Sequence, residues 1–497
     1  MKPETYRKLS IAVIIAAIVL RIALASVHTI SGDACWHFSA AKFIANEKQF
    51  PLFEKIGRDE PFWPSPLFHV VSAFFYTFLG GFGLKLTPFL FSSLSLIIAY
   101  LIFKKFLNEK QTFYATLFMS FLPIGIDYSV LGYPESTIVF FIILSVYFAV
   151  NSRFLLSGIA AGFAILSKFT GPFVILTLLF LAYKGSKNKK EMIKNFIFVT
   201  AVPLIISLPW LIRNWALLGN PVWPFLNFIF NGLQAESYSG LSLANLAQPS
   251  TYAIAYLGFF GVPDGHYRAF FFFDIPYIWL LISIFAIATL IFILPLFFGF
   301  KKDKKINFVY IFIASFAVVM LLFELNVRPA VSRIMLPAIF ALAFIYGVGM
   351  QRITEKYALF GKILLALIII IIGGFSLAEI IKFKAASDSW KIYNDDFEWV
   401  KSNTEKGDLF LFGGQCISYR TERPTLFPSS RYFDIESKYD YVWLNQGFKL
   451  EPQSVLSEEN YNKLTGKIKE QKLKLVYENK KTGTKIYKAS SGQYTVS

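Results

Sequence analysis

Long apolar runs separated by polar stretches dominate most of the chain. They lie at residues 9–28, 64–79, 83–103, 111–127, 134–150, 154–167, 169–183, 194–212, 277–299, 306–324, 332–349 and 361–381. Most of them approach the length of about 20 residues that a helix needs to cross the hydrocarbon core of a bilayer. The pattern therefore predicts an α-helical polytopic membrane protein.

The polar stretches between these runs differ in charge, and basic loops of membrane proteins face the cytoplasm. If segment 64–79 does not cross, every basic cluster falls on one side. The clusters are Lys2, Arg7 and Lys8; Lys104, Lys105 and Lys110; Arg153; Lys184, Lys187, Lys189 and Lys190; Lys301, Lys302, Lys304 and Lys305; and Arg352 and Lys356. We therefore predict about eleven transmembrane helices, with the N-terminus in the cytoplasm and the C-terminus outside.

Three outer regions follow from this topology. The first outer loop covers residues 29–82, where segment 64–79 is expected to form an interfacial helix because Trp63 lies beside it and His69 and Tyr76 lie within it. The second region covers residues 213–276, and the third is the polar tail. We divide the chain into a membrane module, residues 1–384, and an extracytoplasmic domain, residues 385–497.

The tail reads as a small α/β domain. A helix is expected over 393–402, opened by Asn394, Asp395 and Asp396 as a cap. Strand-like runs follow it at residues 408–412, 439–444, 473–477 and 484–488.

The composition agrees with a membrane protein and indicates which kinds of partner it binds. Hydrophobic residues make up 55% of the chain, charged residues 16%, and the net charge is +17. Because the excess lysines lie in short loops beside apolar runs, we expect the lipid bilayer as their partner and no nucleic acid. Nothing marks an organelle, so the plasma membrane is the expected location.

Several kinds of site are not indicated by the sequence. The two cysteines, Cys35 and Cys416, suggest neither a disulfide framework nor metal-binding spacing. No phosphate-cradling glycine loop or paired-cysteine motif is present, which argues against an ATP-driven pump and a nucleotide-sugar enzyme.

Asp33 is the first acid after the first apolar run. If residues 33–46 form a helix, Asp33 and His37 share one face. A carboxylate at this boundary can act as a general base or bind a divalent metal ion through oxygen. The alternative is a helix N-cap, which Gly32 and Asp33 before a helix predict equally well.

Glu135 is a second candidate acid, at the start of an otherwise apolar span. Ionisable residues at such depth usually face a cavity or a partner. Glu135 is therefore a candidate catalytic residue, and with Asp33 a candidate metal ligand. A proline followed by glutamate also suits an ordinary first helical turn. Asp127, at the end of the preceding span, is the competing acid.

Four cations, Lys168, Arg213, Arg328 and Arg333, lie at the predicted outer boundary. Such side chains can bind the phosphate of a lipid at the interface, and arginine offers two parallel donors. Taken singly, each could instead extend to lipid headgroups, as we expect for Arg21 inside the first span.

Several motifs occur in the order found in one superfamily. They are Gly32-Asp33-x-x-Trp36-His37; Pro64-Ser65-Pro66-Leu67-Phe68-His69; Tyr133-Pro134-Glu135; Pro209-Trp210-x-x-Arg213-Asn214 with Gly219-Asn220-Pro221-Val222-Trp223-Pro224-Phe225 after it; and Arg333-Ile334-Met335-Leu336-Pro337. Together they resemble the GT-C superfamily of membrane glycosyltransferases. The nearest resemblance is to the protein O-mannosyltransferase and aminoarabinose-transferase families, glycosyltransferase family 39 and its relatives.

The resemblance implies a specific chemistry. Asp33 would be the catalytic acid/base, and Glu135 would assist it or share a divalent metal ion with it. His37, His69, Lys168, Arg213 and Arg333 would bind substrate. The donor would be a sugar on a polyprenyl or dolichyl phosphate, and the acceptor a protein, lipid or glycan on the outer face.

The chain also departs from the family pattern. Ala34 stands where many relatives have a second acid, and Ser65 interrupts the usual double proline. The oligosaccharyltransferase signature Trp-Trp-Asp-Tyr-Gly is absent from the sequence. The alternative function is a transporter or flippase of lipid-linked intermediates, but that class usually shows repeated halves and charges near mid-membrane.

Overall fold

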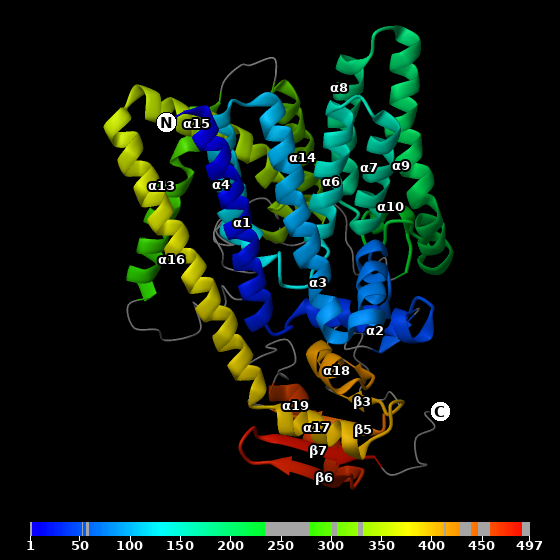
Figure 1. Cartoon of the computed structure of the whole chain (residues 1–497). Helices are drawn as coiled ribbons and strands as arrows, with labels where there is room; N and C mark the ends of the chain where they lie inside the picture. The colour runs from blue at the N-terminus through cyan, green and yellow to red at the C-terminus, as the bar shows by residue number, and fades with distance from the viewer. Residues whose placement is uncertain are drawn as a thin grey trace.

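The structure, a computed structural model, describes residues 2–51, 53–55, 59–233, 278–300, 306–326, 332–411, 414–426, 439–445 and 458–489. A bundle of long helices forms the larger part, and a small domain with a mixed sheet lies against one end of the bundle (Figure 1).

The apolar runs of the sequence coincide with the helices of the bundle. The helices are α1 Pro3–Val27, α2 Asp33–Glu47, α3 Leu67–Phe106, α4 Glu109–Phe121, α5 Pro123–Asp127, α6 Glu135–Val150, α7 Phe154–Ser167, η1 Gly171–Phe173, α8 Val174–Gly185, α9 Lys189–Leu218, α10 Asn227–Phe230, α13 Ile278–Gly299, α14 Asn307–Asn326, η5 Ser332–Met335, α15 Ala338–Lys356 and α16 Ala358–Lys391. A short hairpin of β1 Phe53–Lys55 and β2 Asp59–Pro61, which the sequence did not predict, precedes α3.

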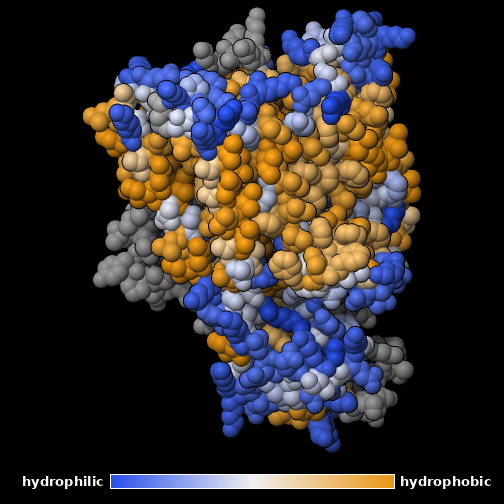
Figure 2. Space-filling view, in the orientation of Figure 1, coloured by the Kyte–Doolittle hydropathy of each residue, from blue (hydrophilic) through white to orange (hydrophobic). Residues whose placement is uncertain are grey.

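On the face shown in Figure 2, an apolar belt covers the bundle between two polar ends. Within the described residues, α1, α3, α9 and α16 are long and apolar enough to cross a membrane, and shorter apolar helices pack among them. Because lipid cannot hydrogen-bond a bare backbone, such an apolar helical bundle is a multi-pass membrane protein. The number of crossings remains a prediction.

Helix α3 bends sharply, and the bend separates the predicted interfacial segment from the following span. Gly80 has φ of 56° and ψ of −144°, which breaks the helix. Ser72 Oγ then donates to Thr87 Oγ1 at 3.1 Å, a contact that a straight helix could not make across 15 residues. Phe74 and Phe78 remain exposed, at 59% and 70%, on the half of α3 before the bend. This exposed apolar stripe suits a helix in the membrane interface.

The predicted basic loops gather at one end of the bundle. Lys105 Nζ donates to Asn151 Oδ1 at 2.8 Å, joining the last turn of α3 to the loop after α6. Lys110 Nζ lies 3.7 Å from Glu355 Oε1 in α15. The basic loop at 301–305 lies outside the described residues. The N-terminus is at this end and the small domain at the other (Figure 1).

Arg21 does not extend toward lipid headgroups, so that prediction was wrong. Its side chain is 1% exposed and donates to the carbonyl oxygens of Ala17 at 3.0 Å and Ser120 at 3.1 Å. Ala17 lies in α1 and Ser120 in α4, which packs directly on this face of α1. The guanidinium is therefore hydrogen-bonded inside the bundle.

The small domain combines helices and strands as predicted, although its sequence signals were incomplete. Its elements are α17 Asn394–Asn403, β3 Phe410–Leu411, α18 Gln415–Thr421, β4 Thr425–Leu426, β5 Tyr441–Leu444, α19 Glu458–Glu470, β6 Lys474–Asn479 and β7 Thr484–Lys488. Strand order is β4-β3-β5-β7-β6, with β3 parallel to β4 and β5, and the other pairs antiparallel. Predicted strands account for β3, β5, β6 and β7, whereas β4, α18 and α19 were missed. Helix α16 continues to Lys391, past the domain boundary we placed at residue 385.

Alternating side chains of β5 face two different cores. Tyr441 and Trp443 pack with α17, α18 and α2, whereas Val442 and Leu444 pack with α19. This period of two buries both faces of the central strand. The face toward α2 fuses the domain to the membrane bundle in one continuous core, and that junction contains the candidate site.

The cap predicted for α17 was wrong, although its helix is present. No side chain caps its N-terminus. Asp396 is instead fully buried and accepts hydrogen bonds from Tyr477 Oη at 2.7 Å, Asn479 Nδ2 at 2.6 Å and Thr484 Oγ1 at 2.7 Å. Satisfying a buried carboxylate in this way ties the helix to β6 and β7.

Candidate functional site

Asp33 is the first residue of α2, and its side chain does not cap the helix. The N-cap position belongs to Gly32, with no side-chain cap. One carboxylate oxygen, Oδ2, accepts from Arg333 Nη1 at 3.2 Å, and the other, Oδ1, accepts from Gln415 Nε2 at 3.2 Å. The alternative of an N-cap aspartate is therefore excluded, and the carboxylate is held by groups far away in sequence.

Glu135 joins the same cluster from the first turn of α6. Its side chain is 2% exposed, and Oε1 lies 2.5 Å from Lys168 Nζ and 3.6 Å from Arg333 Nε. The second oxygen, Oε2, is buried and has no hydrogen-bond partner among the residues that the structure describes. Arg333 therefore lies between the two acids. Such a buried acid is tolerable only beside its cations, because burying an unpaired carboxylate costs several kcal/mol.

Local breaks in helices bring these charges together. Lys168 follows the last residue of α7 in extended conformation, φ −163° and ψ 143°, so its side chain leaves the helix axis. Arg333 comes from the short 3-10 helix η5. Its guanidinium carbon lies 4.9 Å from the centre of the Tyr133 ring, a cation–π contact that orients it.

A glycine allows the turn before α6 to approach α2 closely. Gly132 has φ of +82°, and a Cβ at this position would lie 2.5 Å from the Phe38 ring. Only a residue without a side chain fits this conformation and this distance. The approach places Tyr133 and Glu135 beside the first turn of α2, where Asp33 lies.

The cluster of Asp33, Glu135, Lys168 and Arg333 balances two acids against two cations. Asp33, Lys168 and Arg333 have side chains 25%, 24% and 21% exposed, so a ligand can reach them, while Glu135 lies beneath. An accessible carboxylate can accept a proton, and the adjacent cations can bind a phosphate. The arrangement suits a reaction in which a hydroxyl or amide loses a proton as a phosphate departs.

The two acids do not fit a divalent metal ion as they stand. Both contact cations, and cations occupy the space where an ion would bridge them. Across the described ranges of the chain, no group of three or more histidine, cysteine, aspartate or glutamate side chains could hold a metal ion. We therefore assign no step to a metal.

Asp127, the competing second acid, belongs to a different cluster. Its Oδ1 accepts from Lys382 Nζ at 2.9 Å, and Lys382 also contacts Glu379 in α16. The structure thus brings Glu135, and not Asp127, into contact with the cations around Asp33.

His37 and His69 pair with each other. His37 Nδ1 lies 2.9 Å from His69 Nε2, and His69 Nδ1 lies 3.3 Å from the carbonyl oxygen of Ser65. Both rings are buried between α2 and α3. The predicted shared face of Asp33 and His37 is consistent with α2, and the part of His37 and His69 in binding substrate remains a prediction.

Arg213 contacts the first outer loop. Its guanidinium donates to the carbonyl oxygens of Phe62 at 2.7 Å and Pro51 at 3.2 Å, and it lies over the Trp210 ring at 4.4 Å. These contacts fix the loop against α9. Its role in substrate binding also remains a prediction.

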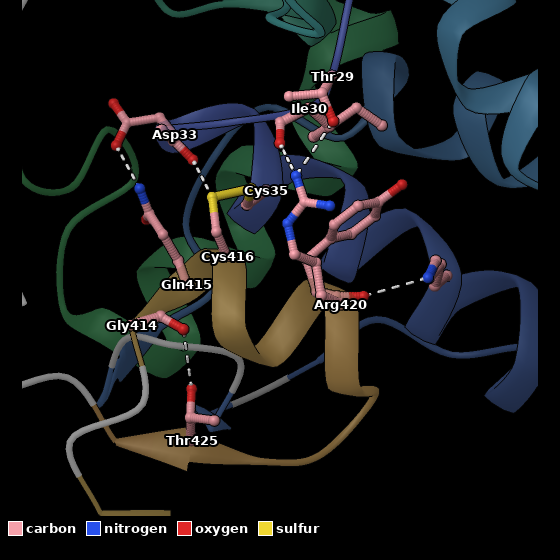
Figure 3. The surroundings of a disulfide bond; sticks show 12 residues. Thr29, Ile30, Asp33, Cys35, Gly414, Gln415, Cys416, Arg420 and Thr425 are labelled. Carbon is pink, nitrogen blue, oxygen red and sulfur yellow. Dashed lines mark hydrogen bonds between the residues drawn. A yellow bond between two sulfur atoms is a disulfide. The ribbon is translucent and has the colours of Figure 1, made fainter. Parts of the chain in front are cut away.

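The sequence analysis missed a disulfide bond at the site. Cys35 and Cys416 are joined, with their Cα atoms 4.9 Å apart, although they are separated by 381 residues in sequence. Figure 3 shows that the bond lies beside the contact of Gln415 with Asp33. Our interpretation of the cysteines as uninformative was therefore wrong. A signal did exist, because both cysteines fall on the predicted outer side, where disulfides form.

Further contacts dock α18 on α2. Arg420 donates to the carbonyl oxygen of Ile30 at 2.9 Å (Figure 3), and Lys42 Nζ lies 2.9 Å from Glu422 Oε1. Burial lowers the pKa of Lys42 more than Glu422 raises it. For Glu422, burial raises the pKa, but the hydrogen bond and charge of Lys42 outweigh it, so the pKa is lowered.

Sequence comparison finds a similarity to a known family in one part of the chain. Residues 60–213 match the family model of dolichyl-phosphate-mannose-protein mannosyltransferases. Among proteins of curated function, none matches the chain.

Solved structures resemble this fold over most of the chain. ArnT from Cupriavidus metallidurans in the apo state matches with a TM-score of 0.63 and 13% identity, over 97% of this chain and 98% of that one. The same protein bound to undecaprenyl phosphate matches with a TM-score of 0.61 and 12% identity, over 98% and 99%. The archaeal oligosaccharyltransferase AglB from Archaeoglobus fulgidus, in complex with an inhibitory peptide and a dolichol-phosphate, matches with a TM-score of 0.52 and 12% identity, over 87% and 69%. The predicted resemblance to the GT-C superfamily is confirmed.

Proposed function

We propose that this protein is a glycosyltransferase that transfers a sugar from a polyprenyl or dolichyl phosphate to an acceptor on the outer face of the membrane. One observation carries the proposal: Arg333 joins Asp33 and Glu135, with Lys168 beside them. A base next to phosphate-binding cations, at a polar end of an apolar bundle, matches what this reaction needs. The lipid phosphates bound to ArnT and AglB supply the donor class.

Asp33 acts as the general base in this proposal. It takes the proton from the acceptor nucleophile, which attacks the anomeric carbon of the donor sugar. The bond from that carbon to the lipid phosphate breaks, and the electron pair leaves with the phosphate. A single displacement of this kind inverts the anomeric centre.

Lys168 and Arg333 stabilise the departing phosphate. Negative charge develops on the phosphate oxygens in the transition state, and fixed cations in a partly dry site stabilise it strongly. Glu135 holds both cations from beneath and so keeps them in place between turnovers. The sugar and acceptor are not specified by this cluster, and a protein, lipid or glycan acceptor each fits the chemistry.

The orientation of the protein follows from charge. The loops around Lys105 and Lys110 share one end of the bundle, and the basic end of a membrane protein faces the cytoplasm. We therefore place the candidate site and the C-terminal domain on the outer face of the plasma membrane.

The test is sugar transfer in proteoliposomes from a panel of radiolabelled polyprenyl-phosphate sugars. We expect the native chain to transfer label and Asp33→Asn to lose about 10²–10⁴-fold in rate, because asparagine keeps the shape but cannot accept the proton. Asp127→Asn is the matched control, since it removes an acid from the separate cluster with Lys382. Native transfer rates in Asp33→Asn would rule out this base. Label crossing the bilayer without transfer would favour the flippase alternative.

A further inference from the structure

We propose that Gln415 of the C-terminal domain is a positioning residue for Asp33, and that the Cys35–Cys416 disulfide holds it there. The inference rests on the proposed function of Asp33 as the base. It assigns a role in the transfer reaction to the domain outside the membrane.

The contact itself orients the carboxylate of Asp33. Gln415 Nε2 donates to Oδ1 at 3.2 Å while Arg333 Nη1 donates to Oδ2 at 3.2 Å, so each oxygen is held by a different donor (Figure 3 shows the Gln415 side). A carboxylate has about four lone-pair sites, so these two contacts do not by themselves prevent it from accepting a proton. Two donors from different elements fix the plane of the group, which one donor would leave able to rotate.

A neutral amide suits this position better than a third cation. Gln415 is 2% exposed, and a buried amide without a partner costs free energy. Its N–H group avoids that cost by donating a hydrogen bond to the carboxylate of Asp33. Unlike a cation, the amide carries no charge. The side chain can therefore orient Asp33 without competing for the proton that Asp33 must take.

The disulfide lies directly beside this contact on both helices, α2 and α18. Cys416 follows Gln415 at the start of α18, and Cys35 lies in the first turn of α2, two residues after Asp33. Both cysteines are fully buried. The covalent bond thus joins the two helical turns that carry the donor and the acceptor, and movement of one turn away from the other would break the hydrogen bond.

Other contacts dock the same helix without touching the acid. Lys42 with Glu422, and Arg420 with the carbonyl oxygen of Ile30, hold the far end of α18. They keep the domain in place if the disulfide is removed. Loss of the disulfide should therefore loosen Gln415 while leaving the domain folded and attached.

The experiment measures kcat and donor KM in the proteoliposome assay. Gln415→Met keeps the length of the side chain and removes the donor. We expect kcat to fall about ten- to a hundredfold, as when a hydrogen bond to a charged group is lost, and donor KM to stay within about twofold. Gln415→Asn keeps the amide on a shorter chain and should fall between native and Gln415→Met. Glu422→Gln, which loosens the far end of α18, should leave kcat unchanged.

The disulfide is tested by non-additivity. Replacing both cysteines by serine should also lower kcat, and adding Gln415→Met should lower it no further than Gln415→Met alone, because both changes remove the same contact. If the combined variant instead loses kcat by the product of the two separate factors, the disulfide does not act through Gln415. Native kcat in Gln415→Met beside an inactive Asp33→Asn would overturn the inference while leaving the proposed function intact. Native transfer in Asp33→Asn would instead overturn the function itself.

Discussion

Lys168 contacts the buried acid Glu135 and is itself partly exposed, with 24% of its side chain accessible. Its ammonium group can therefore turn from the carboxylate to an arriving phosphate without crossing an apolar region. Arg333 is held from two sides and has less freedom. Both cations should stabilise the departing phosphate, but Arg333 should do so from a fixed position that also orients the acids, whereas Lys168 should move with the charge of the leaving group.

This difference predicts the effect of Lys168→Met. Glu135 keeps Arg333 as a partner, so we expect the fold to survive. We expect kcat/KM for the lipid donor to fall about 10²–10³-fold, because one donor to the developing phosphate charge is lost. Lys105→Met is the control, since Lys105 lies at the opposite end of the bundle. Equal kcat/KM values in both variants would contradict the role of Lys168.

The contacts of the two acids also predict that the rate of sugar transfer does not depend on divalent ions. Because Arg333 and Lys168 already neutralise Asp33 and Glu135, a chelator in the assay should change the rate of transfer by less than about twofold. The same preparation, with magnesium or manganese ions added back, supplies the comparison. Loss of transfer with the chelator and its recovery with metal would place a divalent ion at the site.

Candidate site residues could be predicted from the sequence where a charged residue lies beside an apolar span, because such a charge is rare. Asp33, Glu135, Lys168 and Arg333 stood out because a charge beside an apolar span needs a reason. Gln415 carried no such signal, since a neutral amide in a polar tail is ordinary. Its importance comes from a contact across 382 residues, and no local pattern of one sequence encodes such a contact.

At the scale of elements, the turn from Tyr128 to Pro134 depends on Gly132. In Gly132→Ala the new methyl group meets the Phe38 ring, and the positive φ is strained for any residue with a side chain. We expect a loss of about 2–4 kcal/mol in stability, seen as a lower melting temperature in detergent, and reduced transfer because Glu135 moves.

Gly373→Ala provides the comparison for that variant. A Cβ at Gly373, within α16, meets nothing within 4 Å, so alanine should leave the melting temperature unchanged or raise it slightly. A similar fall in the melting temperature of both variants would show that the close approach of Gly132 to Phe38 does not matter for stability.

Elements with strong periodicity were predicted well, and short ones were not. Apolar runs gave the helices of the bundle, and the separation of 64–79 from 83–103 appears as the bend at Gly80. Strand β4 has two residues, and α18 has seven. Such lengths are too short to show a period, so their conformation is set by packing against β3 and α2.

For the whole molecule, docking of the C-terminal domain should depend on pH through Glu422. Its pKa is lowered from the ordinary value of 4.5 in the folded protein. A lowered acid pKa contributes stability above that ordinary value, and the contribution is lost as pH falls through the folded pKa.

The difference in melting temperature between native protein and Glu422→Gln is the quantity to measure. It should be largest near neutral pH and shrink steadily as the pH falls below about 4.5. High salt should reduce it too, because the pair is partly exposed. A difference that stays constant across this range would show that the ion pair with Lys42 contributes nothing to docking.

The disulfide also gives the polypeptide the topology of a closed ring. Most of the helices lie between Cys35 and Cys416 along the chain, so they form one covalent circle. Among the described elements, α1 lies before this circle, and most of α18, the helix α19 and the strands β4 to β7 lie after it. A single protease cut at any loop inside the circle would leave one linked molecule, which would separate into two fragments only under reducing conditions. The ring also cannot close until the chain has been synthesised past residue 416, so the site is completed only after all the helices inside the circle have been made.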